Sequence, residues 1–261
     1  MPLLSVQDLH TWYPVKRGIL ARTVDHVRAV NGVSFTLDAG RTLGVVGQSG
    51  SGKSTLARTI LKLEKPRSGS ILLDGKDIAN LRGPASRAYR RAVQVVFQDP
   101  FASLNPRLTV LQLVTEGMMA HGLCAPAERR EKAAPLLAQV GLDASALDRY
   151  PHAFSGGQRQ RICIARALSL QPRLLICDEA VSALDLSIRA QILNLLLDFQ
   201  KQHGLAYLFI THDLSVVQHI ADTLAVMHQG RFVEHGPTAD IVTNPQTDYT
   251  RQLLKDQLTV P

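Results

Sequence analysis

A glycine-rich segment of the chain has the residue types and spacing that can hold a phosphate chain. It follows the apolar run 42–46 and reads Gly47-Gln48-Ser49-Gly50-Ser51-Gly52-Lys53-Ser54-Thr55. Its glycines permit backbone conformations in which successive N–H groups point at phosphate oxygens, and the helix pattern that follows adds its positive end. In the pattern Gly-x4-Gly-Lys-Ser/Thr, the lysine reaches the β- and γ-phosphates and the next hydroxyl binds Mg²⁺. The segment therefore predicts a nucleoside triphosphate site with Lys53 on phosphate and Ser54 on the metal.

Two adjacent carboxylates follow a second apolar run. Asp178 and Glu179 come directly after residues 174–177. One carboxylate at a strand end is enough to orient Mg²⁺, and a second can polarise the water that attacks the γ-phosphate. An arbitrary Asp-Glu pair is more often a solvated turn or a helix cap. Its position after a buried strand, in a chain with a phosphate loop, favours Asp178 as a metal ligand and Glu179 as the catalytic base.

Two more polar positions have the chemistry to meet the same phosphates. His212 lies just beyond the apolar run 206–210. A lone histidine is more often a packing or capping residue, but at a strand end beside Glu179 it can donate to the γ-phosphate. The segment Ser155-Gly156-Gly157-Gln158 combines a serine cap with two glycines at the start of a helix pattern, which predicts a second anion site.

Strand and helix patterns alternate along most of the chain, which indicates an α/β fold with a mostly parallel sheet. Ligands of such sheets bind at the carboxyl ends of the strands. Strands are predicted at 3–9, 29–37, 42–46, 70–74, 92–97, 173–177, 206–210, 223–227 and 231–235, and helices at 53–61, 156–170, 187–201, 214–221, 238–242 and 249–258. We expect the first strand to lie at a sheet edge, residues 16–28 to form an exposed excursion, and 74–75 and 229–230 to form turns.

Residues 99–155 differ from the rest because they carry helical spacing without strand patterns. We expect them to form a helical subdomain inserted into a core made of residues 1–98 and 156–261. The 261 residues then form one nucleotide-binding domain, a length that allows an ample core.

Composition narrows the class of protein. The chain is 45% hydrophobic and 20% charged, and it contains no run of 18 apolar residues and no signal-peptide layout at its start, so we expect it in the cytosol. The net charge of +7 suits a nucleotide binder docked near lipid, and without an aromatic-interleaved basic stripe it does not favour nucleic acid. Cys124, Cys163 and Cys177 are isolated and are predicted to be buried apolar residues rather than ligands or redox groups.

The order of these motifs resembles that of the ABC-type ATPases. The set is the phosphate loop, Gln98, the signature segment 155–158, Asp178-Glu179, Ser182-Ala183-Leu184-Asp185 and His212, and the resemblance covers essentially the whole chain. It implies an α/β P-loop core with the inserted helical subdomain and an N-terminal antiparallel β subdomain. It also implies ATP and Mg²⁺ as cofactors.

The resemblance assigns roles to single residues. Tyr13 would stack on adenine, with neighbouring Trp12 as the alternative. Gln98 would sense Mg²⁺ and the attacking water, and with Glu179, His212 and Lys53 it completes the catalytic set. The signature residues 155–158 would contact the γ-phosphate of ATP held by a second subunit, and Asp185 would lie at that interface. One chain alone should therefore be a poor ATPase, whereas two chains arranged head to tail would enclose two nucleotides.

A narrower resemblance points to the branch of peptide and nickel importers. It rests on the segments 13–16, 97–107, 150–154, 244–246 and 249–251. ATPases of this branch usually work as two different chains, and this sequence is similar to the second, "F"-type chain, although pairing with itself stays open. The branch implies two membrane permease subunits, an extracytoplasmic substrate-binding protein, and a peripheral position on the cytoplasmic face of the cell membrane. The cargo would be a peptide, nickel or a metallophore.

Three departures from the family pattern bear on these expectations. Ala180-Val181 follows the glutamate where most relatives have Pro-Thr or Pro-Ser, and Cys177 replaces an aliphatic residue. A cysteine-bearing C-terminal extension found in several peptide-transport relatives is not present, so an iron–sulfur cluster is not expected, and nickel, metallophore or small-peptide cargo is favoured.

The alternative to a transporter is a soluble ABC-type ATPase that is not coupled to transport. A purely regulatory nucleotide sensor is disfavoured because all the hydrolytic residues are present.

Overall fold

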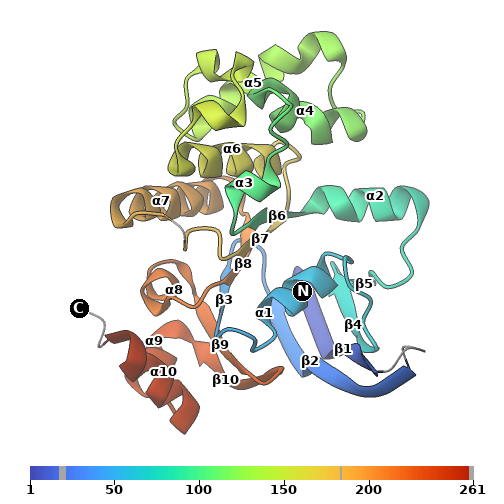
Figure 1. Cartoon of the computed structure of the whole chain (residues 1–261), viewed down its shortest axis with the longest axis vertical. Coiled ribbons are helices and arrows are strands. Elements are labelled where there is room, and N and C mark those ends of the chain that lie inside the picture. The colour runs from blue at the N-terminus through green and yellow to red at the C-terminus, as the bar shows by residue number, and fades with distance from the viewer. Residues whose placement is uncertain (18–21, 183, 259–261) are drawn as a thin grey trace. The chain divides into compact units, whose positions relative to one another are not determined.

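The computed structural model describes residues 1–17, 22–182 and 184–258 (Figure 1). By its internal contacts the chain divides into two compact units. The first contains residues 1–81 and those from 206 onward, and the second contains residues 82–205. Each unit is described by itself below.

The first unit contains an antiparallel sheet in the order β2-β1-β4-β5. Its strands are β1 (Leu4–Arg17), β2 (Arg22–Leu37), β4 (Ser68–Leu73) and β5 (Lys76–Asp77). The antiparallel β subdomain expected at the N-terminus is therefore present. Leu73 pairs with Lys76, so Asp74-Gly75 forms the predicted two-residue turn, and both of its residues have positive φ angles of 50° and 71°.

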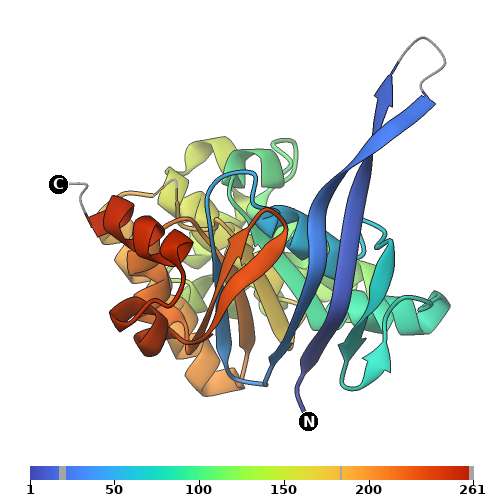
Figure 2. The same ribbon diagram turned by 90° about the horizontal axis from the view of Figure 1, so that it is seen from below.

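One expectation about the N-terminal region is wrong, and a second is confirmed only for the exposure of its residues. The strand that begins near residue 3 does not lie at an edge, because β1 pairs with β2 on one side and with β4 on the other. The described part of segment 16–28 is mostly exposed, as expected, but it is paired strand. It continues β1 and β2 as a long hairpin, in which Trp12 faces Arg28 and Lys16 faces Thr23 (Figure 2). Cross-strand pairs stabilise this hairpin, and the alternation of apolar and polar residues that usually marks a strand is weak there. Residues 18–21 of the segment lie outside the described residues.

The same unit contains four strands in the order β10-β9-β3-β8. They are β3 (Thr42–Val46), β8 (Ala206–Ile210), β9 (Thr223–His228) and β10 (Arg231–Pro237). Strand β3 is parallel to both β8 and β9, and every residue of β3 and of β8 is buried. Continuous apolar runs are typical of strands covered on both faces. The helices of this unit are α1 (Lys53–Ile60), α8 (Leu214–Ile220), α9 (Thr238–Thr243) and α10 (Asp248–Leu258).

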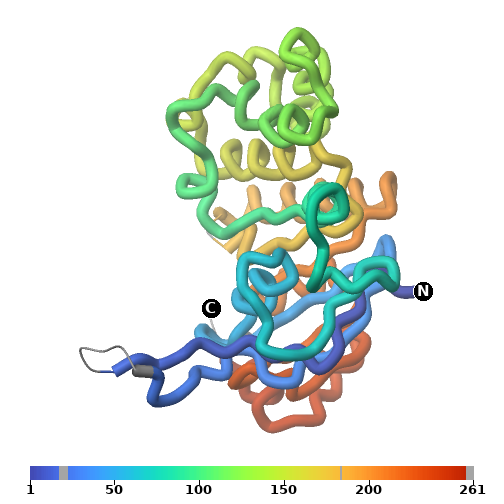
Figure 3. The backbone as a smooth tube through the Cα atoms, turned by 90° about the vertical axis from the view of Figure 1, so that its right-hand side faces the viewer, coloured from blue at the N-terminus to red at the C-terminus, as the bar shows by residue number. Residues whose placement is uncertain are grey.

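The second unit is mostly helical around two parallel strands, β6 (Val93–Phe97) and β7 (Leu174–Asp178). Its helices are α2 (Gly83–Ala92), α3 (Pro100–Ser103), α4 (Val110–Ala120), η1 (Pro126–Glu128), α5 (Arg129–Gln139), η2 (Ala144–Asp148), η3 (Pro151–Ala153), α6 (Gly156–Leu168) and α7 (Leu186–His203). Figure 3 follows the backbone through these turns, and residues 99–155 are helix and loop without a strand, as expected. Helix α2 was not predicted because Tyr89 is its only buried residue, so its sequence has no apolar stripe.

Candidate functional site

The phosphate loop connects strand β3 to helix α1 through glycines that no other residue could replace without strain. Gly52 caps α1 with a φ of 109°, and a Cβ there would lie 1.9 Å from the carbonyl oxygen of Ala29. A Cβ on Gly47 would lie 2.2 Å from the carbonyl oxygen of Met227. Gly50 also has a positive φ of 79°, but nothing lies within 4 Å of its Cβ position. The loop is therefore packed tightly at both ends and open in the middle, a shape that fits an anion at the N-terminus of α1.

Lys53 closes the loop from inside. Its side chain is buried, with 4% of the residue exposed, and Nζ donates to the carbonyl oxygens of Gly47 at 2.7 Å and Gln48 at 3.0 Å. Nζ also lies 3.4 Å from the hydroxyl of Ser51. Residues 48–50 are exposed, and Ser54 and Thr55 follow Lys53 in the first turn of α1, where they are half-buried. The Lys53 ammonium therefore lies inside the loop, and its positive charge can attract phosphate oxygens.

His212 lies at the same edge of the sheet as the phosphate loop. Val45 pairs with Ile210 in the parallel register of β3 and β8, so both strands end together. The N–H of Thr211 donates to the carbonyl of Val45 at 3.2 Å, which extends the pairing by one residue. His212 follows and is exposed, and Asp213 begins α8 by accepting from the N–H of Ser215. Within this unit, the fold thus brings two of the predicted elements to one edge.

Of the two aromatic residues considered for adenine, Trp12 already makes contacts within the protein. The guanidinium carbons of Arg28 and Arg67 lie 4.9 and 4.4 Å from the centre of the Trp12 ring, so cation–π contacts already engage that ring. Thr11 contacts helix α1, because its hydroxyl lies 3.0 Å from that of Thr59.

The second unit brings another pair of predicted residues to one strand edge. Phe97 pairs with Asp178 in the parallel register of β6 and β7, and Gln98 and Glu179 directly follow them. Asp178 is buried, Gln98 is exposed, and Glu179 is half-buried. Glu179 has a φ of 53°, a left-handed conformation that is costly for a residue with a side chain. Such strain is often found at functional positions.

Helix α6 holds the backbone beside this glutamate. Gln160 is 1% exposed, and its amide nitrogen donates to the carbonyl oxygen of Ala180 at 2.5 Å. The N–H of Ser182 donates to the carbonyl of Glu179, which makes a turn of the residues between them. Ala180 and Val181 are buried, so the two residues that depart from the family pattern pack in the interior.

The signature segment forms the N-terminus of α6. Ser155 caps the helix by accepting from the N–H of Gln158, whose side chain accepts in return from the N–H of Ser155 at 3.1 Å. Gly156 has nothing within 4 Å of its Cβ position. A cavity of about 240 Å³ adjoins the segment and is lined by Gly141, Leu142, Ser155, Gly157, Gln158, Arg161, Ile188 and Gln191. The predicted second anion site is therefore an accessible helix start. Asp185 immediately precedes α7 and is exposed, whereas Ala183 of the same motif lies outside the described residues.

Comparison with known proteins identifies the family. A family model described as ABC transporter matches residues 30–182. The oligopeptide transport ATP-binding protein AppF of Bacillus subtilis is 51% identical over 253 residues, which are 97% of this chain and 77% of AppF. The dipeptide transport ATP-binding protein DppF of Escherichia coli is 50% identical over 253 residues, 97% of this chain and 75% of DppF. The chain belongs to the ABC transporter family.

Other relatives of this ABC cassette extend the comparison. The glutathione import ATP-binding protein GsiA of Pectobacterium atrosepticum is 50% identical over 97% of this chain, which spans only 41% of GsiA. Among solved structures, cbiO1 from Clostridium perfringens, part of the ABC transporter complex cbiONQ, has a TM-score of 0.79 and 30% identity and covers 93% of this chain and 91% of its own. The ATP-binding cassette MJ0796, in a dimeric post-hydrolysis state bound to ADP and Pi, has a TM-score of 0.79 and 27% identity, covering 90% and 98%.

Several contacts of the ABC cassette were not predicted from its sequence. They include the hydrogen bond between Gln160 and Ala180 and a hydrogen bond from the N–H of Gln48 to the hydroxyl of Tyr249. Neither hydrogen bond can be predicted from a local sequence pattern, because each joins residues that are far apart along the chain. Within the described part of the chain, no group of three His, Cys, Asp or Glu side chains is placed to hold a metal ion, and no helix is long and apolar enough to cross a membrane.

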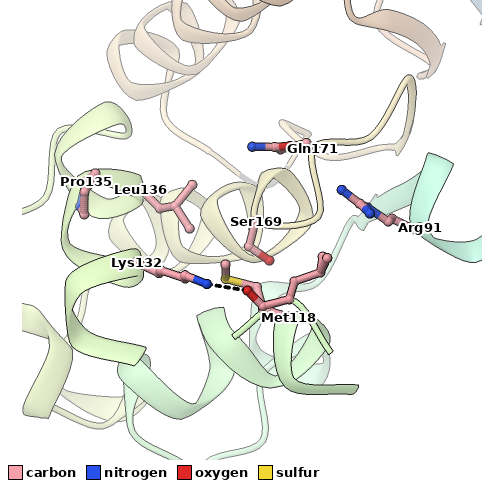
Figure 4. A pocket seen from close by; sticks show the side chains of 8 residues that line it. Arg91, Met118, Lys132, Pro135, Leu136, Ser169 and Gln171 are labelled. Atoms are coloured by element: carbon pink, nitrogen blue, oxygen red, sulfur yellow. Dashed lines mark hydrogen bonds between the residues drawn. The ribbon is translucent and has the colours of Figure 1, made fainter. Parts of the chain in front are cut away.

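One cavity of the second unit is not part of this site. It has a volume of about 380 Å³ and is lined by Arg91, Met118, Leu123, Lys132, Pro135, Leu136, Ser169 and Gln171 (Figure 4). No predicted site residue contributes to it. Its lysine is engaged, because Nζ of Lys132 donates to the carbonyl of Leu123 at 2.5 Å and lies 3.1 Å from Glu128.

The three cysteines of the ABC cassette are buried, as predicted, and none forms a disulfide. Burial raises the pKa of Cys163 to about 11 and raises the pKa of Cys177 well above its ordinary value. Both thiols are therefore protonated at neutral pH, which suits apolar packing and does not suit a nucleophile.

Gly157 of the signature segment should tolerate a side chain less well than Gly156. In Gly157→Ala the new Cβ would lie 2.6 Å from Cγ2 of Ile188, and we expect a loss of about 1–3 kcal/mol in the free energy of unfolding. Gly156→Ala is the matched control, because its Cβ meets open space and a few tenths of a kcal/mol is the expected change. Urea unfolding measures both. The double variant Gly157→Ala with Ile188→Ala should relieve the clash, and equal effects of the two glycine substitutions would contradict this account.

Proposed function

We propose that this chain is the ATP-hydrolysing subunit of an ABC importer that takes up peptides across the cell membrane. The observation that carries the proposal is the presence, in one chain, of a lysine-closed phosphate loop and a separate, accessible signature helix start. Family membership and the peptide-transport names of AppF and DppF support the same conclusion.

Nucleotide binding is proposed to use the loop and the strand ends. The amides of Gly47, Ser49, Gly50, Ser51, Gly52, Lys53, Ser54 and Thr55 and the Lys53 ammonium would hold the phosphates, and Tyr13 would stack on the adenine ring. Ser54, Gln98 and Asp178 would hold Mg²⁺, and their hydroxyl, amide and carboxylate oxygens are the hard ligands that this ion prefers. Mg²⁺, when bound, supplies positive charge that neutralises the phosphates.

Hydrolysis is proposed to centre on Glu179. Its carboxylate would accept a proton from the attacking water as the oxygen bonds to the γ-phosphorus and the bond to the bridging oxygen of ADP breaks. Gln98 would orient the same water. His212 and Lys53 would donate hydrogen bonds to γ-phosphate oxygens as charge develops there.

Two cassettes are proposed to complete each site. Ser155, Gly156, Gly157 and Gln158 of one chain would contact the γ-phosphate held by the loop of the other, and Asp185 would lie at this interface. The dimeric state of MJ0796 supports this arrangement. The narrower family resemblance favours a sister chain as the partner, although a second copy of this chain would satisfy the same geometry. Residues 99–155 are proposed as the inserted subdomain between the two core segments 1–98 and 156–261.

Transport is proposed to follow from the difference in ATP affinity between open and closed dimers, because binding favours closure and hydrolysis reverses it. Two membrane permease subunits would take up this movement, a substrate-binding protein outside the membrane would deliver cargo, and this chain would lie on the cytoplasmic face. AppF, DppF and GsiA are named for peptides and glutathione, so a peptide is favoured over nickel or a metallophore. These names also disfavour a soluble ABC-type ATPase.

The test is a pull-down from detergent-solubilised membranes with tagged Glu179→Gln chain and ATP. Recovery of a second ATPase, two membrane subunits and a substrate-binding protein is the expected result. Titration of that binding protein with dipeptides, oligopeptides and Ni²⁺ then identifies the cargo. Tagged Lys53→Ala chain is the matched control, because it should not form the closed dimer. Recovery of soluble partners alone would overturn the transport proposal and leave the soluble ATPase.

A further inference from the structure

The C-terminal helix α10 contacts the phosphate loop directly. The hydroxyl of Tyr249, in the first turn of α10, accepts a hydrogen bond from the N–H of Gln48 at 3.2 Å. Gln48 is the second residue of the loop and lies 201 positions earlier in the chain. Both residues belong to the first unit.

The Tyr249 ring is held from two sides. The ring of His228, the last residue of β9, lies 4.0 Å from it between centroids. Tyr249 also packs against a buried cluster that includes Val46, which directly precedes the loop, and Leu253 one turn further along α10. The position of the hydroxyl is therefore determined by the ends of β3 and β9 rather than by a mobile tail.

Glu234 holds the turn that leads into α10. Glu234 of β10 accepts from the N–H groups of Gln246 at 2.8 Å and Thr247 at 3.2 Å, and from the hydroxyl of Thr247. Partial burial of Glu234 opposes its ionisation, but hydrogen bonds from Thr250, Gln246 and Thr247 outweigh this effect and hold its pKa below the ordinary value. An ionised Glu234 thus places the start of α10 against the sheet.

Tyr249 and Lys53 together hold the backbone of Gln48. The N–H of Gln48 donates to Tyr249, and its carbonyl accepts from Nζ of Lys53 at 3.0 Å and from the N–H of Ser51 at 3.2 Å. Lys53 must turn from these carbonyls to reach phosphate, which frees one anchor of the loop. Tyr249 does not have to move, because its bond is to the N–H.

We propose that Tyr249 is a positioning residue of the nucleotide site, which keeps the start of the phosphate loop in its binding conformation when Lys53 turns to the nucleotide. This inference rests on the proposed ATPase function. Tyr249 acts through the Gln48 backbone and touches no reacting atom. Tyr249 therefore increases the affinity for ATP and does not change the rate of the chemical step.

The test is Tyr249→Phe, which removes the hydroxyl and keeps the ring on His228. A neutral hydrogen bond contributes about 0.5–1.5 kcal/mol, so we expect Kd and KM for ATP to rise roughly 2- to 13-fold. The kcat of the assembled transporter should change by less than about twofold. Tyr150→Phe is the matched control, because Tyr150 is an exposed tyrosine that stacks on His152 in the second unit. It should leave Kd and KM unchanged.

A second measurement separates this proposal from the proposed function. Amide hydrogen exchange of a peptide covering residues 47–52, without nucleotide, should be faster in Tyr249→Phe than in the wild type or Tyr150→Phe. If the wild type does not bind ATP, the proposed function fails, and the exchange result alone decides whether Tyr249 positions the loop. Unchanged exchange, or ATP affinity equal to that of the wild type, would overturn the proposal, as would a fall in kcat at constant KM.

Discussion

Replacing Glu179 by glutamine should abolish nearly all ATP hydrolysis while leaving ATP binding intact. Glutamine keeps the size and the hydrogen-bonding reach of the side chain but cannot accept a proton from water, and general bases contribute about 10²- to 10⁴-fold to the rate. The strained left-handed backbone at Glu179 and the bond from Gln160 to the next carbonyl should hold either side chain in the same place. We therefore expect kcat to fall by roughly 10²-fold or more, with Kd for ATP within about threefold of the wild type.

Phosphate release by the assembled transporter and titration with a fluorescent ATP analogue measure the two quantities separately. Glu116→Gln is the matched control, because Glu116 is an exposed glutamate on α4, and it should leave both quantities unchanged. Undiminished hydrolysis by Glu179→Gln would show that another group activates the water. A parallel loss of ATP binding would show instead that the carboxylate serves binding.

Replacing Lys53 by alanine should have the largest effect on ATP binding. The ammonium is buried inside the loop, where it donates to carbonyls at 2.7 and 3.0 Å, and by turning from these carbonyls it can donate to phosphate oxygens instead. Charge-assisted hydrogen bonds are about twice as strong as neutral ones, and loss of two of them corresponds to roughly a 10²-fold rise in Kd for ATP. Hydrolysis should fall with binding.

The control for this prediction is Lys65→Ala, which removes an exposed lysine beyond the end of α1 and should leave Kd for ATP within about twofold of the wild type. Because Lys53 also holds two loop carbonyls, its removal should speed amide exchange in residues 47–52 even without nucleotide. Wild-type ATP affinity in Lys53→Ala would contradict the assignment of this lysine to phosphate.

The parts of the fold that could be predicted from the sequence are those in which local pattern and burial agree. Strands β3, β7 and β8 are buried throughout and read as apolar runs, so polar residues at their ends could be located from the sequence alone. The phosphate loop could also be predicted, because glycine is required at positions with a positive φ angle or with a close backbone neighbour. For the same reason the capping box of Ser155 and Gln158 could be anticipated from residues three positions apart.

Other elements were decided only by tertiary structure. Helix α2 buries one residue, so nothing in its composition distinguishes it from a polar loop. Strand β1 lies inside its sheet only because β4 pairs with it, through residues such as Leu73 opposite Leu4 that are far away along the chain. The bonds from Gln48 to Tyr249 and from Gln160 to Ala180 likewise join distant residues. The order of apolar and polar residues along a segment indicates which of its side chains are buried. Which distant partner a side chain or a strand meets depends on how the whole chain packs, and for this protein that packing decides which residues support the phosphate loop and the glutamate.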